Sequence, residues 1–202
     1  MLEFFEEFPE MSRGDLRDFK KVIDSAFRSF SRTYGESIEN FFDPVLWFLI
    51  WFEKLLVNTP WPIIMLIIAL LCYLGSRNWK LPLASILTFT LIGYLGMWAD
   101  TMSTIALISV ATMLCIIIGM PLGIWMARYD AVQKTLNPLL DIMQTIPIFV
   151  YLLPVLMLLG IGKVPGLIAI CVYAMPPIIR LTNLGIRLVD KDILEAANAF
   201  GA

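Results

Sequence analysis

The polar side chains best placed to act on a solute in apolar surroundings lie near residue 141. Asp141 is the only acidic residue inside a predicted membrane span, and Gln144 and Thr145 follow three and four residues later. This spacing places all three on one helical face, where they would line a polar path or bond to neighbouring helices. A structural role for Asp141 is the alternative. Asn137 and Pro138 are typical of a helix start, which would place Asp141 near the positive end of the helix dipole.

Prolines are the second unusual feature of the apolar stretches. Those inside or beside the predicted spans include Pro121, Pro147, Pro154, Pro176 and Pro177. Each removes a backbone donor and kinks or breaks a helix, and in lipid the freed carbonyls need partners in protein or in a watery cavity. We therefore interpret Pro147, Tyr151, Pro154, Pro176 and Pro177 as candidate translocation-path or gating residues, alongside the group at residue 141. The simpler alternative is that proline is frequent in membrane helices generally.

The composition excludes several other kinds of chemistry. The chain has no histidine, and its cysteines, Cys72, Cys115 and Cys171, match no zinc or redox spacing, so no metal site is expected. It also lacks the phosphate-binding loop G-x-x-x-x-G-K-[ST]. Of 202 residues, 59% are hydrophobic and 16% charged, with a net charge of −2. These values argue against a soluble domain, a disordered chain and a nucleic-acid binder, and they predict a protein embedded in a lipid bilayer.

The first 44 residues form a polar, acidic tail. They hold six basic and ten acidic residues, half of all the charged residues in the chain. Within 14–32, one helical face carries Leu16, Phe19, Ile23, Phe27 and Phe30. This segment is interpreted either as a helix on the membrane surface or as a helix that packs on its own protein.

A short apolar segment, 45–57, follows Asp43 and Pro44, which are typical of a helix start. Its length of about 20 Å falls short of the roughly 30 Å hydrocarbon core. It also contains Glu53 and Lys54. Residues 45–60 are therefore predicted to form an interfacial or re-entrant helix.

Residues 61–202 are predicted to form a transmembrane helical bundle, so the expected fold class is all-α and polytopic. Five spans are expected, at 62–74, 81–98, 104–127, 139–160 and 164–179, the last ending at Pro176 and Pro177.

The connections between these spans predict an orientation. Basic residues gather in alternate connections, at Arg77, Lys80, Arg128, Lys134, Arg180, Arg187 and Lys191. By the positive-inside rule these connections and the C-terminal segment are cytoplasmic, and five crossings then place the N-terminal tail outside. A sixth crossing at 45–57 would return the tail to the cytoplasm.

The final segment, LTNLGIRLVDKDILEAANAFGA, is more polar than the spans and has the pattern of a short amphipathic helix. Its residues Glu195, Ala196 and Ala197, followed after three residues by Gly201, resemble the EAA motif of permease subunits in binding-protein-dependent ATP-binding-cassette (ABC) importers. The stretches 118–128, 138–166 and 173–202 resemble the quaternary-amine branch of that family, the permeases for glycine betaine, proline betaine and choline.

This resemblance implies an inner-membrane permease subunit that carries quaternary amines by alternating access. It implies a permease dimer, two cytoplasmic ATPase subunits that hold the ATP, and an extracytoplasmic substrate-binding protein. It also implies that Glu195, Ala196, Ala197 and Gly201 form a coupling helix that contacts the ATPase. No cofactor is then expected in this chain, and 61–202 is expected to be a partial transmembrane domain that ends in the coupling segment.

Three alternatives remain open at this point. The chain stops at Ala202, inside the motif, so it is also interpreted as a truncated subunit that does not transport alone. An ion-coupled secondary transporter would need intramembrane charges or broken helices, for which Asp141 is the main candidate. A membrane enzyme is disfavoured by the lack of histidine and of clustered nucleophiles.

Overall fold

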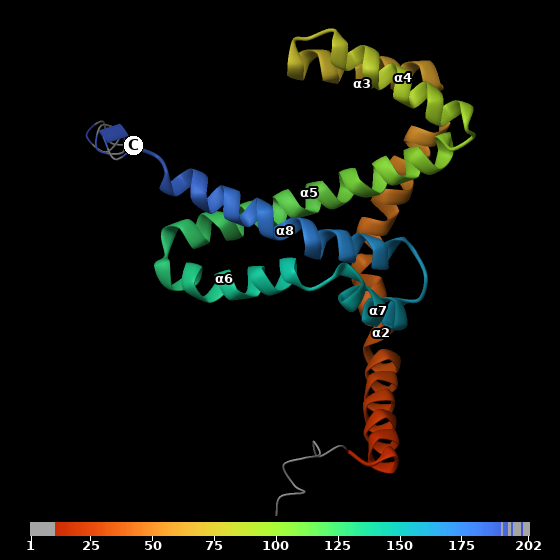
Figure 1. The fold of residues 1–202 in the computed structure, drawn as a ribbon, viewed down its shortest axis with the longest axis vertical. Coiled ribbons are helices and arrows are strands. Elements are labelled where there is room, and N and C mark those ends of the chain that lie inside the picture. Colours follow the sequence, from red (N-terminus) through yellow and green to blue (C-terminus); the bar gives the residue numbers. More distant parts are fainter. Residues whose placement is uncertain (1–10, 191, 194, 196–198, 200–202) are drawn as a thin grey trace, which may run out of the picture.

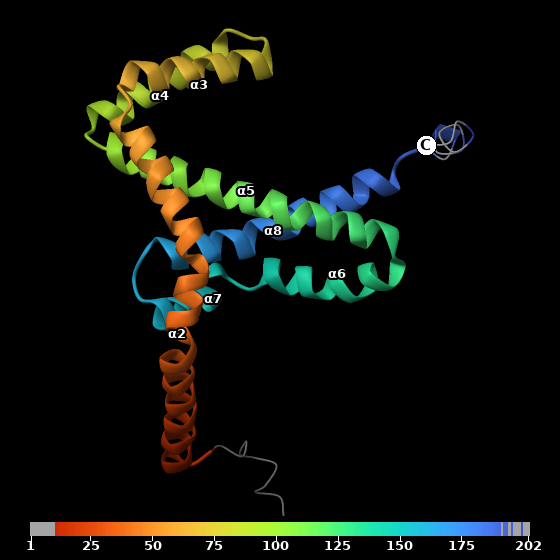
Figure 2. The same cartoon turned by 180° about the vertical axis from the view of Figure 1, so that it is seen from behind.

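The computed structural model describes residues 11–190, 192, 193, 195 and 199. Every regular element in this part is an α-helix, which confirms the predicted fold class (Figure 1). The helices are α2 (Arg13–Asn58), α3 (Trp61–Ser76), α4 (Lys80–Tyr94), α5 (Trp98–Arg128), α6 (Asp130–Thr145), α7 (Ile148–Leu159) and α8 (Lys163–Arg187). In both Figure 1 and Figure 2, α5 and α8 run side by side, and α2 runs crosswise to them.

The number of helices able to cross a membrane is smaller than the sequence predicted. By length and composition, α5 and α8 qualify alone. The count rises to four if each of two bent pairs is one span: Asn40–Asn58 with α3, bent by 105°, and α6 with α7, bent by 87°. The expected span 139–160 is thus broken at Pro147, which caps α7. With 15 residues, α4 reaches only about 22 Å, less than the hydrocarbon thickness of roughly 30 Å.

Three helix boundaries predicted at prolines are wrong. Pro44 lies inside α2, Pro138 lies inside α6, and α8 continues through Pro176 and Pro177 to Arg187. A proline inside a helix loses one backbone hydrogen bond, and neighbouring helices can offset this loss. Pro176 has such neighbours, because it is fully buried in the packed part of α8.

The core lies where α2, α5 and α8 meet. Its buried side chains are Leu49, Ala106, Val110, Ala111 and Leu167. A second buried cluster, Met126, Leu140 and Ile179, joins α5, α6 and α8.

Two glycines allow α5 and α8 to approach closely. A Cβ atom on Gly123 would lie 2.6 Å from the Cβ of Thr182 and 2.8 Å from the carbonyl oxygen of Ile179. At Gly119, one turn earlier, it would lie 3.1 Å from Ile178 Cγ2. The spacing Gly-x-x-x-Gly is typical of membrane helix pairs whose backbones pack together.

The α5–α8 contact can be tested by adding one methyl group. Gly123→Ala should lower the midpoint of thermal unfolding, because relieving the overlap with α8 costs roughly 1–3 kcal/mol. The matched control is Gly185→Ala in α8, where an added Cβ meets nothing within 4 Å. The control should leave the midpoint unchanged or raise it, because alanine is the better helix former. Circular dichroism of the purified proteins in detergent would measure both, and equal midpoints for the two variants would contradict the close contact.

Candidate functional site

Asp141 lies in α6 and pairs with an arginine of α8. Its Oδ1 is 2.5 Å from Arg180 Nη2. The two residues are 39 positions apart in the chain, so the ion pair joins two separate helices. Asp141 is in the last turns of α6 rather than the first, since α6 begins at Asp130. The helix-start interpretation of Asp141 is therefore wrong, because the helix begins eleven residues earlier.

A second ion pair joins the same two helices closer to the connection between α5 and α6. Arg187 Nη2 lies 2.6 Å from Asp130 Oδ1. It also donates to the carbonyl oxygen of Met126, at 3.1 Å, and Arg187 Nε donates to Asn183 Oδ1 at 3.0 Å. Met126 is in the last turn of α5, where backbone carbonyls have no partner within the helix and the dipole favours a cation. One guanidinium thus binds the end of α5, the start of α6 and the end of α8.

The two ion pairs fit the helix geometry. Arg180 and Arg187 are two turns apart on α8, and Asp141 and Asp130 are about three turns apart on α6. The residue later in α8 pairs with the residue earlier in α6, so the helices are antiparallel at this contact. We call these contacts the α6–α8 charge pairs. Asp141 and Asp130 are 63% and 75% exposed, so each pair adds a modest attraction that holds α6 against α8.

The other predicted path residues lie on α6, α7 and α8 or at the break between α6 and α7. Gln144 and Pro154 are exposed, and the Thr145 hydroxyl donates to the carbonyl of Ile142 in its own helix at 3.4 Å. Tyr151 donates its hydroxyl to the carbonyl of Met143 at 3.3 Å, across the break at Pro147. Tyr151 thus joins α6 to α7. A path formed by these residues remains a prediction.

The predicted coupling residues lie at the edge of the described part. Glu195 is helical and exposed, eight residues beyond the end of α8 at Arg187. Ala196, Ala197 and Gly201 lie outside the described residues. In Figure 1, the end of α8 lies at the same end of the molecule as the connection between α5 and α6.

A third polar cluster lies near the first residues of α5 and α8, at the other end of these helices from Arg187. Glu53 of α2 forms an ion pair with Lys163, at the start of α8, and accepts a hydrogen bond of 2.8 Å from the Ser103 hydroxyl of α5. Glu53 therefore adds a polar contact to the apolar packing of Leu49 that joins α2 to the bundle.

Sequence reasoning missed the partners in all of these contacts. Arg180 and Arg187 served only as indicators of orientation, and the glycine pair of α5 was not recognised. The Gly119-x-x-x-Gly123 spacing was a usable signal. The two-turn spacing of Arg180 and Arg187 was a weaker one, because it does not say which helix faces them.

The all-α fold, with two helices long and apolar enough to cross a membrane and two further bent pairs, is that of a multi-pass membrane protein. Residues 119–202, which hold both α6–α8 charge pairs, match the family described as binding-protein-dependent transport system inner membrane component. The match covers less than half of the chain, and it confirms the predicted resemblance to that family.

Curated relatives agree with this assignment. The chain is 45% identical to the glycine betaine/proline betaine transport system permease protein ProW of Escherichia coli (strain K12), over 79% of this chain and 45% of that protein. It is 41% identical to the glycine betaine/carnitine transport permease protein GbuB of Listeria monocytogenes serotype 1/2a (strain 10403S), over 71% and 51%. It is 42% identical to the glycine betaine transport system permease protein OpuAB of Bacillus subtilis (strain 168), over 66% and 47%. The chain spans about half the length of these relatives.

Exchanging the charges of one pair tests the α6–α8 contact. Asp130→Arg alone should lower the thermal unfolding midpoint, because it places a second cation beside Arg187. Adding Arg187→Asp should recover part of the loss, with a coupling energy of about 0.2–1 kcal/mol in a double-mutant cycle, because Asp130 is largely exposed. Lys134→Glu, a charge reversal at another exposed α6 position, is the control and should show no coupling to Arg187→Asp. Additive effects of Asp130→Arg and Arg187→Asp would contradict the contact.

Proposed function

We propose that this chain forms part of the permease subunit of an ABC importer for quaternary amines of the glycine betaine, proline betaine and choline type. The observation that carries the proposal is the match of residues 119–202 to the inner membrane component family, together with relatives whose names include glycine betaine and proline betaine. ATP hydrolysis is assigned to partner subunits, because the sequence has no phosphate-binding loop. The further partners are an extracytoplasmic substrate-binding protein and a second permease subunit.

The packing near residue 187 supports a coupling role for the final segment. Arg187 contacts the ends of three helices and is the last residue of α8. A displacement of Glu195 and its neighbours would therefore act on α5, α6 and α8 together rather than on one helix. ATP-driven movement of a bound ATPase could in this way shift the equilibrium between inward- and outward-facing states.

The transport proposal is tested by uptake of radiolabelled glycine betaine. The full-length protein, with its ATPase and binding protein, is expressed in cells that lack other betaine uptake. Uptake should require all three components and should stop when the phosphate-binding lysine of the ATPase is replaced. Uptake that persists without an active ATPase would favour an ion-coupled transporter instead.

The coupling role of Glu195 is tested in the same assembly. Glu195→Lys should reduce substrate-stimulated ATP hydrolysis by about fivefold or more, at the low end of typical coupling free energies. Asp192→Lys makes the same charge change three residues earlier, outside the motif, and should have the smaller effect. Equal activity of the wild type and Glu195→Lys would remove the residue from the coupling contact.

The proposed orientation places α2 on the extracytoplasmic side and the final segment in the cytoplasm. The supporting observation is that α2 contacts α5 and α8 near their first residues, through Ser103 and Lys163, whereas the final segment follows the far end of α8. In a variant without native cysteines, Ser29→Cys should react with an impermeant maleimide in intact cells. Asp192→Cys should react only in inverted vesicles. The reverse pattern would invert the topology.

A further inference from the structure

A pocket lined with aromatic rings lies where the ends of four helices meet. Its volume is about 570 Å³, which is within the range of small-molecule sites. The last residues of α2, the start of α3, the end of α4 and the first residue of α5 form its walls. In Figures 1 and 2, the connection between α2 and α3 lies at the same corner of the molecule as the connection between α4 and α5.

Four aromatic side chains line this pocket: Trp61, Phe89, Tyr94 and Trp98. Phe89 and Trp98 are partly buried and pack edge to face, with their ring centroids 6.3 Å apart. Trp61 and Tyr94 are 61% and 89% exposed, so much of each ring is free to contact a ligand. The faces of aromatic rings carry negative charge density, and they therefore attract cations.

The two hydroxyl groups that line the pocket are hydrogen-bond acceptors toward a ligand. Thr59 Oγ1 donates to the carbonyl oxygen of Leu55 at 2.5 Å. Thr90 Oγ1 donates to the carbonyl oxygen of Ile86 at 2.7 Å. Each hydroxyl has one proton, which is used within its own helix, so only its lone pairs remain for a ligand. The residues that line the pocket all lie in the described part of the chain, and none of them is acidic or basic.

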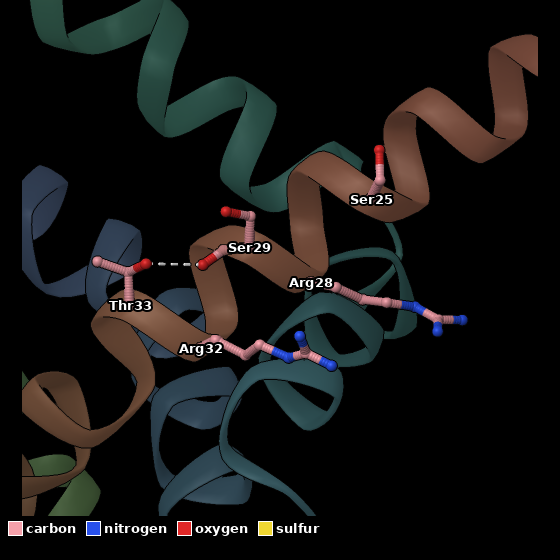
Figure 3. Close-up of a pocket in the computed structure, with 5 residues that line it drawn as sticks. All are labelled: Ser25, Arg28, Ser29, Arg32 and Thr33. Carbon is pink, nitrogen blue, oxygen red and sulfur yellow. Dashed lines mark hydrogen bonds between the residues drawn. The ribbon is translucent and has the colours of Figure 1, made fainter.

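Another hollow, on α2, has the opposite chemistry. Its lining residues, all from this one helix, are Ser25, Arg28, Ser29, Arg32 and Thr33. Figure 3 shows the side chains of Arg28 and Arg32 extending from the helix in the same direction. Two guanidinium groups repel a cation, and a single helix does not surround a ligand. The aromatic pocket is therefore the better site for a cation.

We propose that the pocket between α2, α3, α4 and α5 binds a quaternary ammonium group through cation–π contacts with its rings. A quaternary ammonium group carries its charge on methyl groups that donate no strong hydrogen bonds, so ring faces can replace its water without an acidic partner. The proposed orientation places the pocket on the extracytoplasmic side, because it includes the first residue of α5. This placement, and the choice of choline as the ligand, rest on the proposed function.

The proposal is tested by comparing choline with its uncharged analogue, in which a carbon atom replaces the nitrogen. The full-length permease, without ATPase or binding protein, is placed in nanodiscs of phosphatidylethanolamine and phosphatidylglycerol, which contain no quaternary ammonium. Saturation-transfer difference NMR detects binding through the methyl protons of each ligand, and empty nanodiscs give the background. Choline should bind, and the neutral analogue should bind several-fold more weakly. Equal binding of the two ligands would overturn the proposal.

Substitutions test whether choline binds in this pocket. Trp61→Leu should weaken choline binding by about twofold to thirtyfold, the value of one cation–π contact. Gly93→Leu should also weaken it by filling the pocket, and the added Cβ lies at an ordinary 3.7 Å from Trp98 Cε3, so the rings stay in place. The matched control is Trp79→Leu, 66% exposed in the connection between α3 and α4, which should bind choline like the wild type.

Circular dichroism checks that each variant is as helical as the wild type. Wild-type affinity in both Trp61→Leu and Gly93→Leu would place choline elsewhere and overturn the proposal. If choline does not bind at all, the proposal is also overturned, and the rings are anchors at the membrane–water interface.

Adding phosphatidylcholine to the nanodiscs distinguishes two sources of the quaternary ammonium group. Loss of the choline signal there would assign the pocket to a lipid headgroup, and an unchanged signal would assign it to a soluble amine; both outcomes support the site. Choline binding without uptake in the full assembly would contradict the proposed function alone. Uptake without choline binding to the permease would contradict the site alone.

Discussion

The close approach of α5 and α8 at Gly119 and Gly123 is the constraint on which the other contacts depend. In lipid there is no hydrophobic drive between apolar helices, so their association relies on packing at short range. A side chain at Gly123 would overlap the backbone and side chain of α8, and the helices would have to separate. That separation would move Arg187 away from the Met126 carbonyl, which lies only three residues beyond Gly123.

The charged side chains of the bundle lie away from the middle of the α5–α8 contact. The middle of the α5–α8 contact is apolar, and the ion pairs lie toward its ends: Glu53 with Lys163 at one end, and the α6–α8 charge pairs toward the other. Each pair joins different helices, so each ion pair also fixes a helix–helix contact. The end that holds Arg187 precedes the segment containing Glu195, and the end that holds Glu53 connects the bundle to α2. The two ends of the bundle are therefore connected to different segments, one to α2 and the other to the final segment that contains Glu195.

Hydropathy predicted the all-α membrane fold and the strongest spans, because the cost of exposing a polar backbone to lipid is a local property of the sequence. Proline was a poor guide to helix boundaries for the opposite reason. Pro138 and Pro176 lie within helices, whereas Pro147 lies at the break between α6 and α7. Whether a proline ends a helix depends on the neighbours that compensate for its missing hydrogen bond, and these come from distant parts of the chain.

The same dependence on residues distant in the chain limited what the sequence could predict about Asp141. The sequence identified Asp141 but could not say whether it faces a path or a partner, because Arg180 is 39 residues away and was assigned to a connection. An acid that binds a transported cation or proton must be able to exchange its counterion. Asp141 is instead paired with the Arg180 guanidinium of α8. In the state described here, this pairing favours a structural role for Asp141 in holding α6 against α8, and any polar path through the bundle would have to involve other side chains or a rearrangement of this pair.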